Sequence, residues 1–168
     1  MKLFLSLVFL VCLTLLQQAC HFSNTSNIKL EQIKADLPDD QKERWSLMTG
    51  LWYGSQPIKQ GGKKEWLIKR EENGFYEIKF RNHLADGSIE ERVEVGDWGI
   101  AESFYFSIFN GWIINEQFVP ADRKDPYNRD IYKIIRLNKT LFEYENISTR
   151  DRFTVIRVAD DYSFSDLK

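Results

Sequence analysis

From Leu47 to Val158, apolar and polar residues alternate with a period close to two. This is the pattern of β-strands that turn one face to a core and the other to water. Asn73-Gly74, Asp86-Gly87 and Asn110-Gly111 interrupt the alternation, and such pairs favour the tight turns of β-hairpins. The pattern predicts nine strands: Leu47–Ser55, Glu65–Arg70, Phe75–Leu84, Ile89–Val95, Glu102–Phe109, Trp112–Phe118, Arg129–Leu137, Leu141–Asn146 and Arg152–Val158.

The connections between these strands are mostly short, and no internal helix interrupts them. Consecutive hairpins favour an all-β, up-and-down antiparallel barrel of eight to nine strands, because a Greek-key sandwich needs a long return connection. One longer loop, Val119 to Asn128, leaves a sandwich open as the alternative.

The segment before the first strand has a different period. Ile28, Leu30, Ile33 and Leu37 lie at roughly helical spacing until Pro38-Asp39-Asp40 interrupts them. Proline and acidic residues suit a first helical turn, so a short helix is expected from about Asp39 to Leu47. This helix is either the cap of one barrel end or a generic amphipathic lead-in.

The first residues have the composition of an export signal. Met1-Lys2 is positively charged, and the apolar run from Leu3 to Leu16 is shorter than the roughly 18 to 20 residues that span a bilayer. The chain has two cysteines, Cys12 in this run and Cys20 just after it, so the remaining domain has no internal disulfide. The expected segments are a signal peptide at 1–19, a tether and N-terminal helical segment at 20–46, the barrel at 47–160, and a C-terminal tail at 161–168.

The end of the signal, Leu16-Gln17-Gln18-Ala19-Cys20, resembles the lipobox of bacterial lipoproteins. The resemblance implies that Cys20 is the lipid anchor, acylated with chains such as palmitate. His21 follows it in place of the aspartate that retains such proteins in the inner membrane, which implies an outer-membrane lipoprotein. Gln17 departs from the family pattern, and plain secretion or an uncleaved anchor are the alternatives.

Composition narrows the function classes. A chain of 168 residues with 43% hydrophobic residues suits one domain with a substantial core. The net charge is −2 and charges of both signs are mixed, which argues against a nucleic-acid partner because such binding needs clustered basic residues. His83 shares the water-facing side of its strand with Lys79 and Arg81, and no spacing of His, Cys or carboxylates indicates a metal, a cofactor or a catalytic set.

Five motifs together resemble small bacterial lipocalin-like lipoproteins. They are Gly50-x-Trp52, Glu65-Trp66, Tyr76-x-Ile78-x-Phe80, Gly96-x-Trp98 and Phe153-x-Val155-x-Arg157. The resemblance implies that Gly50 and Trp52 close one end of a barrel and that Arg157 stacks on the Trp52 ring. It also implies a non-catalytic protein that binds a small apolar or amphipathic molecule.

Strand parity, as assigned to each strand, gives the candidate ligand-binding residues. They are Trp66, Ile68, Tyr76, Ile78, Phe80, Phe104, Phe106, Tyr132, Phe142 and Tyr144. An eight-stranded barrel either holds one small ligand or is filled by its own side chains, and rings this numerous allow both. The alternative to ligand binding is therefore an envelope protein with a filled barrel and a protein partner on its outer strands. An enzyme that uses inward Tyr and Arg groups is a third hypothesis.

Overall fold

The computed structural model describes residues 37–58 and 61–164. The predicted signal segment, Cys20, the tether and the helical spacing before Leu37 lie outside the described residues. Contacts group Asp39–Lys168 into one compact unit, and the fold below is that unit. Within the described residues, no helix has the length and apolar character needed to cross a membrane.

Helix α3 (Asp39–Met48) opens the described fold and confirms the predicted short helix. Asp39 and Asp40 lie in its first turn, where negative charge is stabilised by the helix dipole. The helix ends where Gly50 adopts a φ of 110°, a conformation that residues with a side chain rarely adopt. The chain then turns directly into the first strand.

Nine strands follow, separated mainly by short turns. They are β1 (Gly50–Pro57), β2 (Gly62–Arg70), β3 (Phe75–Leu84), β4 (Ile89–Ala101), β5 (Phe104–Ile114), β6 (Gln117–Pro120), β7 (Arg129–Leu137), β8 (Leu141–Asn146) and β9 (Arg152–Arg157). A short 3-10 helix, η1 (Pro126–Asn128), precedes β7.

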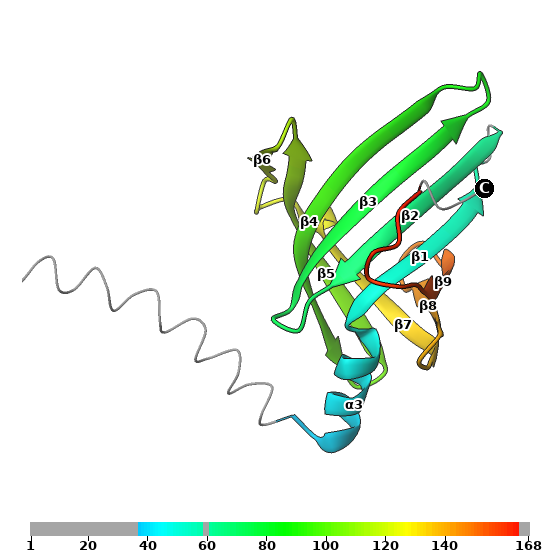
Figure 1. The fold of residues 1–168 in the computed structure, drawn as a ribbon. Helices are drawn as coiled ribbons and strands as arrows, with labels where there is room; N and C mark the ends of the chain where they lie inside the picture. The colour runs from blue at the N-terminus through cyan, green and yellow to red at the C-terminus, as the bar shows by residue number, and fades with distance from the viewer. Residues whose placement is uncertain (1–36, 59–60, 165–168) are drawn as a thin grey trace, which may run out of the picture. The chain divides into compact units, whose positions relative to one another are not determined.

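The sheet closes on itself. Its strand order is β4-β3-β2-β1-β9-β8-β7-β5-β6, all neighbours are antiparallel, and β4 also pairs with β5. Eight strands therefore form a closed up-and-down barrel, with α3 at one end, and β6 is an extra strand that pairs only with β5 (Figure 1). The predicted all-β barrel is confirmed, and the sandwich alternative is wrong because closure leaves no second sheet.

The predicted turn at Asn110-Gly111 is wrong. Strand β5 continues through both residues, and the pairing with β4 shifts register between Val95 and Gly96. The shift leaves Asn110 as an extra residue in a β-bulge, which bends the strand without reversing it. The chain reverses instead at Asn115-Glu116, whose positive φ angles of 50° and 63° suit a tight hairpin turn.

Side chains fill only part of the barrel. The half next to α3 holds a continuous core that includes Met48, Trp52, Tyr76, Trp98 and Phe142. A second apolar cluster lies outside the barrel, where Tyr162 and Phe164 of the C-terminal segment pack against β1 and β2. Figure 1 shows this segment crossing the outer side of those strands.

Candidate ligand-binding site

The barrel end next to α3 is closed by Trp52 and Arg157. Trp52 is fully buried and donates from Nε1 to the Met48 carbonyl at 2.9 Å. The guanidinium carbon of Arg157 lies 4.3 Å from the Trp52 ring centroid, so the cation stacks on the indole. A side chain at Gly50 would overlap Arg157 Nη1, so the glycine allows this approach.

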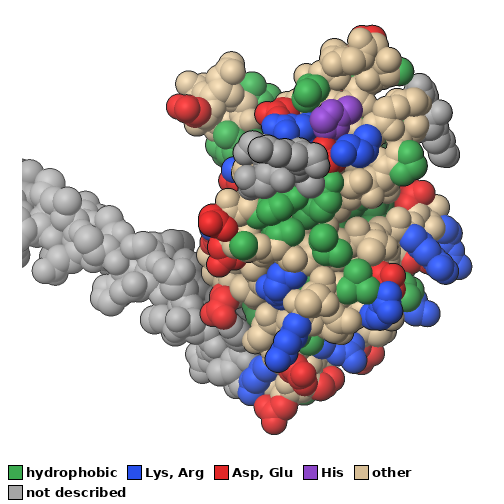
Figure 2. Space-filling model, turned by 45° about the vertical axis from the view of Figure 1, so that its right-hand side comes forward, with side chains coloured by type: hydrophobic (Ala, Val, Ile, Leu, Met, Phe, Trp, Pro, Cys, Tyr) green, Lys and Arg blue, Asp and Glu red, His purple; other side chains and the backbone are tan. Residues whose placement is uncertain are grey.

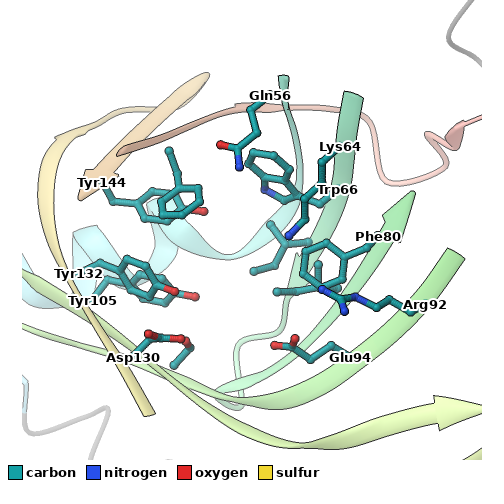
Figure 3. A pocket seen from close by; sticks show the side chains of 14 residues that line it. Gln56, Lys64, Trp66, Phe80, Arg92, Glu94, Tyr105, Asp130, Tyr132 and Tyr144 are labelled. Carbon is teal, nitrogen blue, oxygen red and sulfur yellow. The ribbon is translucent and has the colours of Figure 1, made fainter. Parts of the chain in front are cut away.

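A cavity of about 230 Å³ occupies the barrel interior toward the opposite end. Strands β1 to β5 and β7 to β9 all contribute to its wall (Figure 3). The lining side chains are Gln56, Lys64, Trp66, Ile68, Ile78, Phe80, Arg92, Glu94, Tyr105, Ser107, Asp130, Tyr132, Tyr144 and Phe153.

Six of the ten candidate residues line this cavity: Trp66, Ile68, Ile78, Phe80, Tyr132 and Tyr144. Tyr76 and Phe142 also point inward, but they belong to the filled core beneath the cavity. The structure therefore combines the two predicted interiors, a solid core near α3 and a hollow at the other end.

Phe104 and Phe106 do not line the cavity, which corrects the inward direction expected for them. Phe104 is 40% exposed, and the inward residues of this part of β5 are Tyr105 and Ser107. Residues on both faces of this strand are apolar, so alternation does not indicate which face points into the barrel. Phe106 lies against Gly99 of β4 and is absent from the cavity wall, so it lies on the same side of β5 as Phe104.

Four charged side chains line the cavity and were not predicted: Lys64, Arg92, Glu94 and Asp130. Among the described residues, none of the four forms an ion pair with another charged side chain. Lys64 shares the parity of Trp66 and Ile68 in the sequence, so strand alternation could have found it.

Neighbouring polar side chains satisfy the two carboxylates. The Tyr76 hydroxyl donates to Glu94 Oε1 at 2.8 Å, and Asn146 Nδ2 donates to Asp130 Oδ1 at 2.9 Å. Burial raises the pKa of Glu94, although the Tyr76 hydrogen bond and the positive charges of Arg92 and Lys64 oppose this shift. Burial also lowers the pKa of Lys64, and the positive charge of Arg92 lowers it further.

Tyrosine hydroxyls, together with the side chains of Gln56 and Ser107, supply neutral polar groups to the wall. Burial raises the pKa of both Tyr132 and Tyr144, so both remain neutral near pH 7. The rings of Tyr105 and Tyr132 stack with centroids 5.2 Å apart. The cavity can thus offer flat apolar surface, neutral hydrogen-bonding groups and charge to one small molecule.

A second polar cluster lies on the outer face of the barrel, around Glu65. This side chain is 2% exposed, and it accepts from the Tyr53 hydroxyl at 2.5 Å and pairs with Lys63 at 2.8 Å. His83 Nε2 lies 2.6 Å from the other carboxylate oxygen. His83 is on the outer side, as expected, but its partner Glu65 is buried. Figure 2 shows the histidine beside basic and acidic side chains on this face.

Replacing Glu65 with glutamine is expected to lower the free energy of unfolding by about 1 to 2 kcal/mol, because three donors lose a buried charged acceptor. Burial opposes ionisation, but Lys63, Tyr53 and His83 together hold the pKa of Glu65 below its ordinary 4.5. A lowered folded pKa stabilises the protein above the unfolded value and loses this effect as pH falls. Denaturant unfolding between pH 7 and pH 3 measures the difference. In the exposed control Glu91→Gln the loss should stay below about 1 kcal/mol.

Within residues 37–58 and 61–164, no group of three or more His, Cys, Asp or Glu side chains could hold a metal ion.

Comparison with solved structures finds a similar barrel. The chain is similar to a lipocalin-like protein from Bacteroides uniformis, with 13% identity over 67% of this chain and 99% of the other, and a TM-score of 0.42. The fold is lipocalin-like. This assignment rests on the closed strand order and on the arrangement of Gly50, Trp52 and Arg157. No family model matches the sequence, and neither does any curated protein.

Proposed function

We propose that this protein binds one small amphipathic molecule inside its lipocalin-like barrel and does not transform it. The observation that carries the proposal is the cavity of about 230 Å³, whose wall combines aromatic rings with four charged side chains. Apolar surface with a few convergent polar groups is typical of small-molecule sites. A barrel built only for stability would gain more from a continued apolar core.

The cavity volume limits the size of the ligand. Sites for drug-sized molecules are roughly 300 to 1,000 Å³, and this cavity is smaller. The ligand class is therefore a compact molecule with a flat or short apolar body, not a long acyl chain.

Binding can be tested on molecules that accompany the protein from cells. Native mass spectrometry is expected to detect a bound small molecule, which denaturing extraction then releases for identification. Ser107→Leu places a larger side chain in the cavity and should abolish the bound mass. Thr154→Leu, an exposed position of β9, is the matched control and should retain it. An empty wild-type protein, or retention in Ser107→Leu, would contradict ligand binding in this cavity.

We also propose that the protein is an exported lipoprotein of the bacterial outer membrane. The apolar run before Ala19-Cys20 supports this, as does the absence of any cysteine after Cys20. Cys20→Ser is expected to abolish labelling with radioactive palmitate and to move the protein from the membrane fraction to the soluble fraction. Cys12→Ser should leave labelling unchanged. Persistent membrane association of Cys20→Ser without label would instead indicate an uncleaved anchor.

A protein partner on the outer face is the second candidate function. Phe104 of β5 and two residues of β7, Ile131 and Ile135, are 40%, 46% and 47% exposed. Helix α3 does not cover them, because they keep this exposure with the helix in place. Replacing Ile131 and Ile135 with threonine should abolish co-purification of such a partner and leave the cavity ligand bound.

A further inference from the structure

We infer that the cavity recognises an anionic group, held between Lys64 and Arg92, on a compact ligand. This inference rests on the proposed ligand-binding function and names the chemical class of the ligand. The group is a carboxylate, phosphate or sulfate, because each can accept several hydrogen bonds from ammonium and guanidinium donors.

The two cations both lie close to the Phe80 ring. Lys64 Nζ is 4.3 Å from the ring centroid, and the guanidinium carbon of Arg92 is 5.0 Å from it. The strand register produces this arrangement, because Phe80 pairs with Arg92 on β4 and with Trp66 on β2, two residues from Lys64. Figure 3 shows both side chains reaching toward the cavity beside Phe80.

The donors of these two cations are unfilled. Within the described residues, neither Lys64 nor Arg92 has a hydrogen-bond acceptor or an ion-pair partner within 4 Å, and both lie close to aromatic rings. The charge of Glu94 offsets part of theirs, but burial, followed by the positive charge of Arg92, still lowers the pKa of Lys64. An anion between them would relieve the repulsion between the two cations and satisfy donors of both side chains.

The carboxylates of the cavity differ from the cations, because each already accepts a hydrogen bond. Tyr76 donates to Glu94 and Asn146 donates to Asp130. A cationic ligand would have to share each carboxylate with a donor already bound to it, whereas an anionic ligand would find donors with no partner. Of the four charged side chains of the wall, the two cations are the ones without a hydrogen-bond partner among the described residues.

A third cation lies beneath the cavity floor. Arg70 is 1% exposed, and no acceptor among the described residues is in hydrogen-bonding geometry with its three nitrogens. Its guanidinium carbon lies 4.8 Å from the ring centroid of Tyr105, a residue of the cavity wall. A buried positive charge at this depth raises the electrostatic potential of the cavity above it and favours an anion there.

Three probes of nearly equal size test the inference on the full-length protein in nanodiscs. They are 3-phenylpropionate, 3-phenylpropan-1-ol and 3-phenylpropylamine, which share a body and differ in head-group charge. Calorimetric titration is expected to show the acid binding about tenfold more tightly than the alcohol, with the amine weakest. The affinity for the acid should fall as salt is added, and that for the alcohol should not.

Variants assign the effect to residues. Lys64→Met and Arg92→Met should each weaken binding of the acid about tenfold and leave the alcohol unchanged. Lys79→Met removes a neighbouring cation from the outer face of β3 and should change neither affinity.

Equal affinity for the acid and the alcohol would overturn the inference and leave the ligand-binding function intact. Unchanged affinity for the acid in the Lys64→Met, Arg92→Met double variant would do the same. Tightest binding of the amine would also overturn it, because Glu94 and Asp130 would then recognise the ligand. If no probe binds and the protein carries no ligand from cells, the proposed function fails as well.

Discussion

Replacing Arg157 with methionine is expected to lower the free energy of unfolding by about 4 kcal/mol, the largest loss among the substitutions considered. Arg157 belongs to the last strand, and its guanidinium donates to the carbonyls of Leu47, in the last turn of α3, and of Thr49, which precedes β1. The Nε atom donates to Lys139 at 2.8 Å, and the cation stacks on Trp52. One side chain thus joins the end of the helix, the first strand and the turn before β8.

The loss has two physical sources. Hydrogen bonds from a charged donor contribute roughly 1.5 to 3 kcal/mol each, and a desolvated cation–π contact contributes about 1 to 2 kcal/mol. These terms overlap because the same geometry maintains all of them, so the total is less than their sum. Methionine preserves the aliphatic part of the side chain and isolates the loss of the guanidinium.

Chemical denaturation of wild type, Arg157→Met and Arg157→Lys measures the effect. Lysine should recover part of the stability, because it retains a charge over Trp52 but has one nitrogen in place of the three that reach separate carbonyls in Arg157. Arg152→Met is the matched control on the same strand, since Arg152 is exposed and pairs only with Glu145, and it should cost less than about 1 kcal/mol. Equal losses in Arg157→Met and Arg152→Met would show that the Trp52 stack does not secure this end of the barrel.

Replacing Arg70 with methionine is expected to have the opposite sign and to raise the free energy of unfolding by about 2 to 3 kcal/mol. Transfer of an ionised group out of water costs several kcal/mol even after relaxation. Among the described residues Arg70 has no counter-ion, and although the Tyr144 hydroxyl lies near it, none of its nitrogens makes a hydrogen bond of good geometry. Its contacts with the rings of Tyr105 and Phe142, at 4.8 and 5.4 Å, offset only part of that cost. Methionine fills a similar volume and keeps contact with both rings.

Arg81→Met provides the comparison. Arg81 also lies against an aromatic ring, that of Phe164, but it pairs with Glu91 at 2.6 Å and is partly exposed. Its replacement should destabilise by about 1 kcal/mol, so the two Arg→Met changes should shift the melting temperature in opposite directions. A loss of stability in Arg70→Met comparable to that in Arg81→Met would mean that Arg70 is a structural residue.

Together these results would separate stability from function. Arg70→Met could be more stable than the wild type and also bind 3-phenylpropionate more weakly. This result would mean that the buried cation favours ligand binding and lowers the stability of the fold. The same barrel then has one arginine that secures its closed end and another that destabilises its interior.

Local patterns were sufficient for most of the strands. The predicted bounds of Phe75–Leu84, Arg129–Leu137 and Leu141–Asn146 agree with β3, β7 and β8 at both ends. Strand alternation and turn residues act over a few neighbours, so they can be read without the fold. The turn predicted at Asn110-Gly111 failed because a bulge opposite Val95 and Gly96 absorbs the extra residue, and this depends on the partner strand.

The sequence by itself determined the all-β class, the helix before the barrel and the Gly50, Trp52 and Arg157 set, because each follows from local periodicity or a short motif. Alternation also gave the inward side of several strands, including that of Trp66, Ile68 and Lys64 on β2. Only the tertiary structure turned Tyr105 in and Phe104 out on β5, where both faces are apolar, and placed Arg92, Glu94 and Asp130 at the cavity wall. The physical reason is closure, because strand registers around the whole barrel decide which face is enclosed. Charged side chains usually indicate the solvent-facing side of a strand, but in a barrel with a polar cavity they can lie on the inner side.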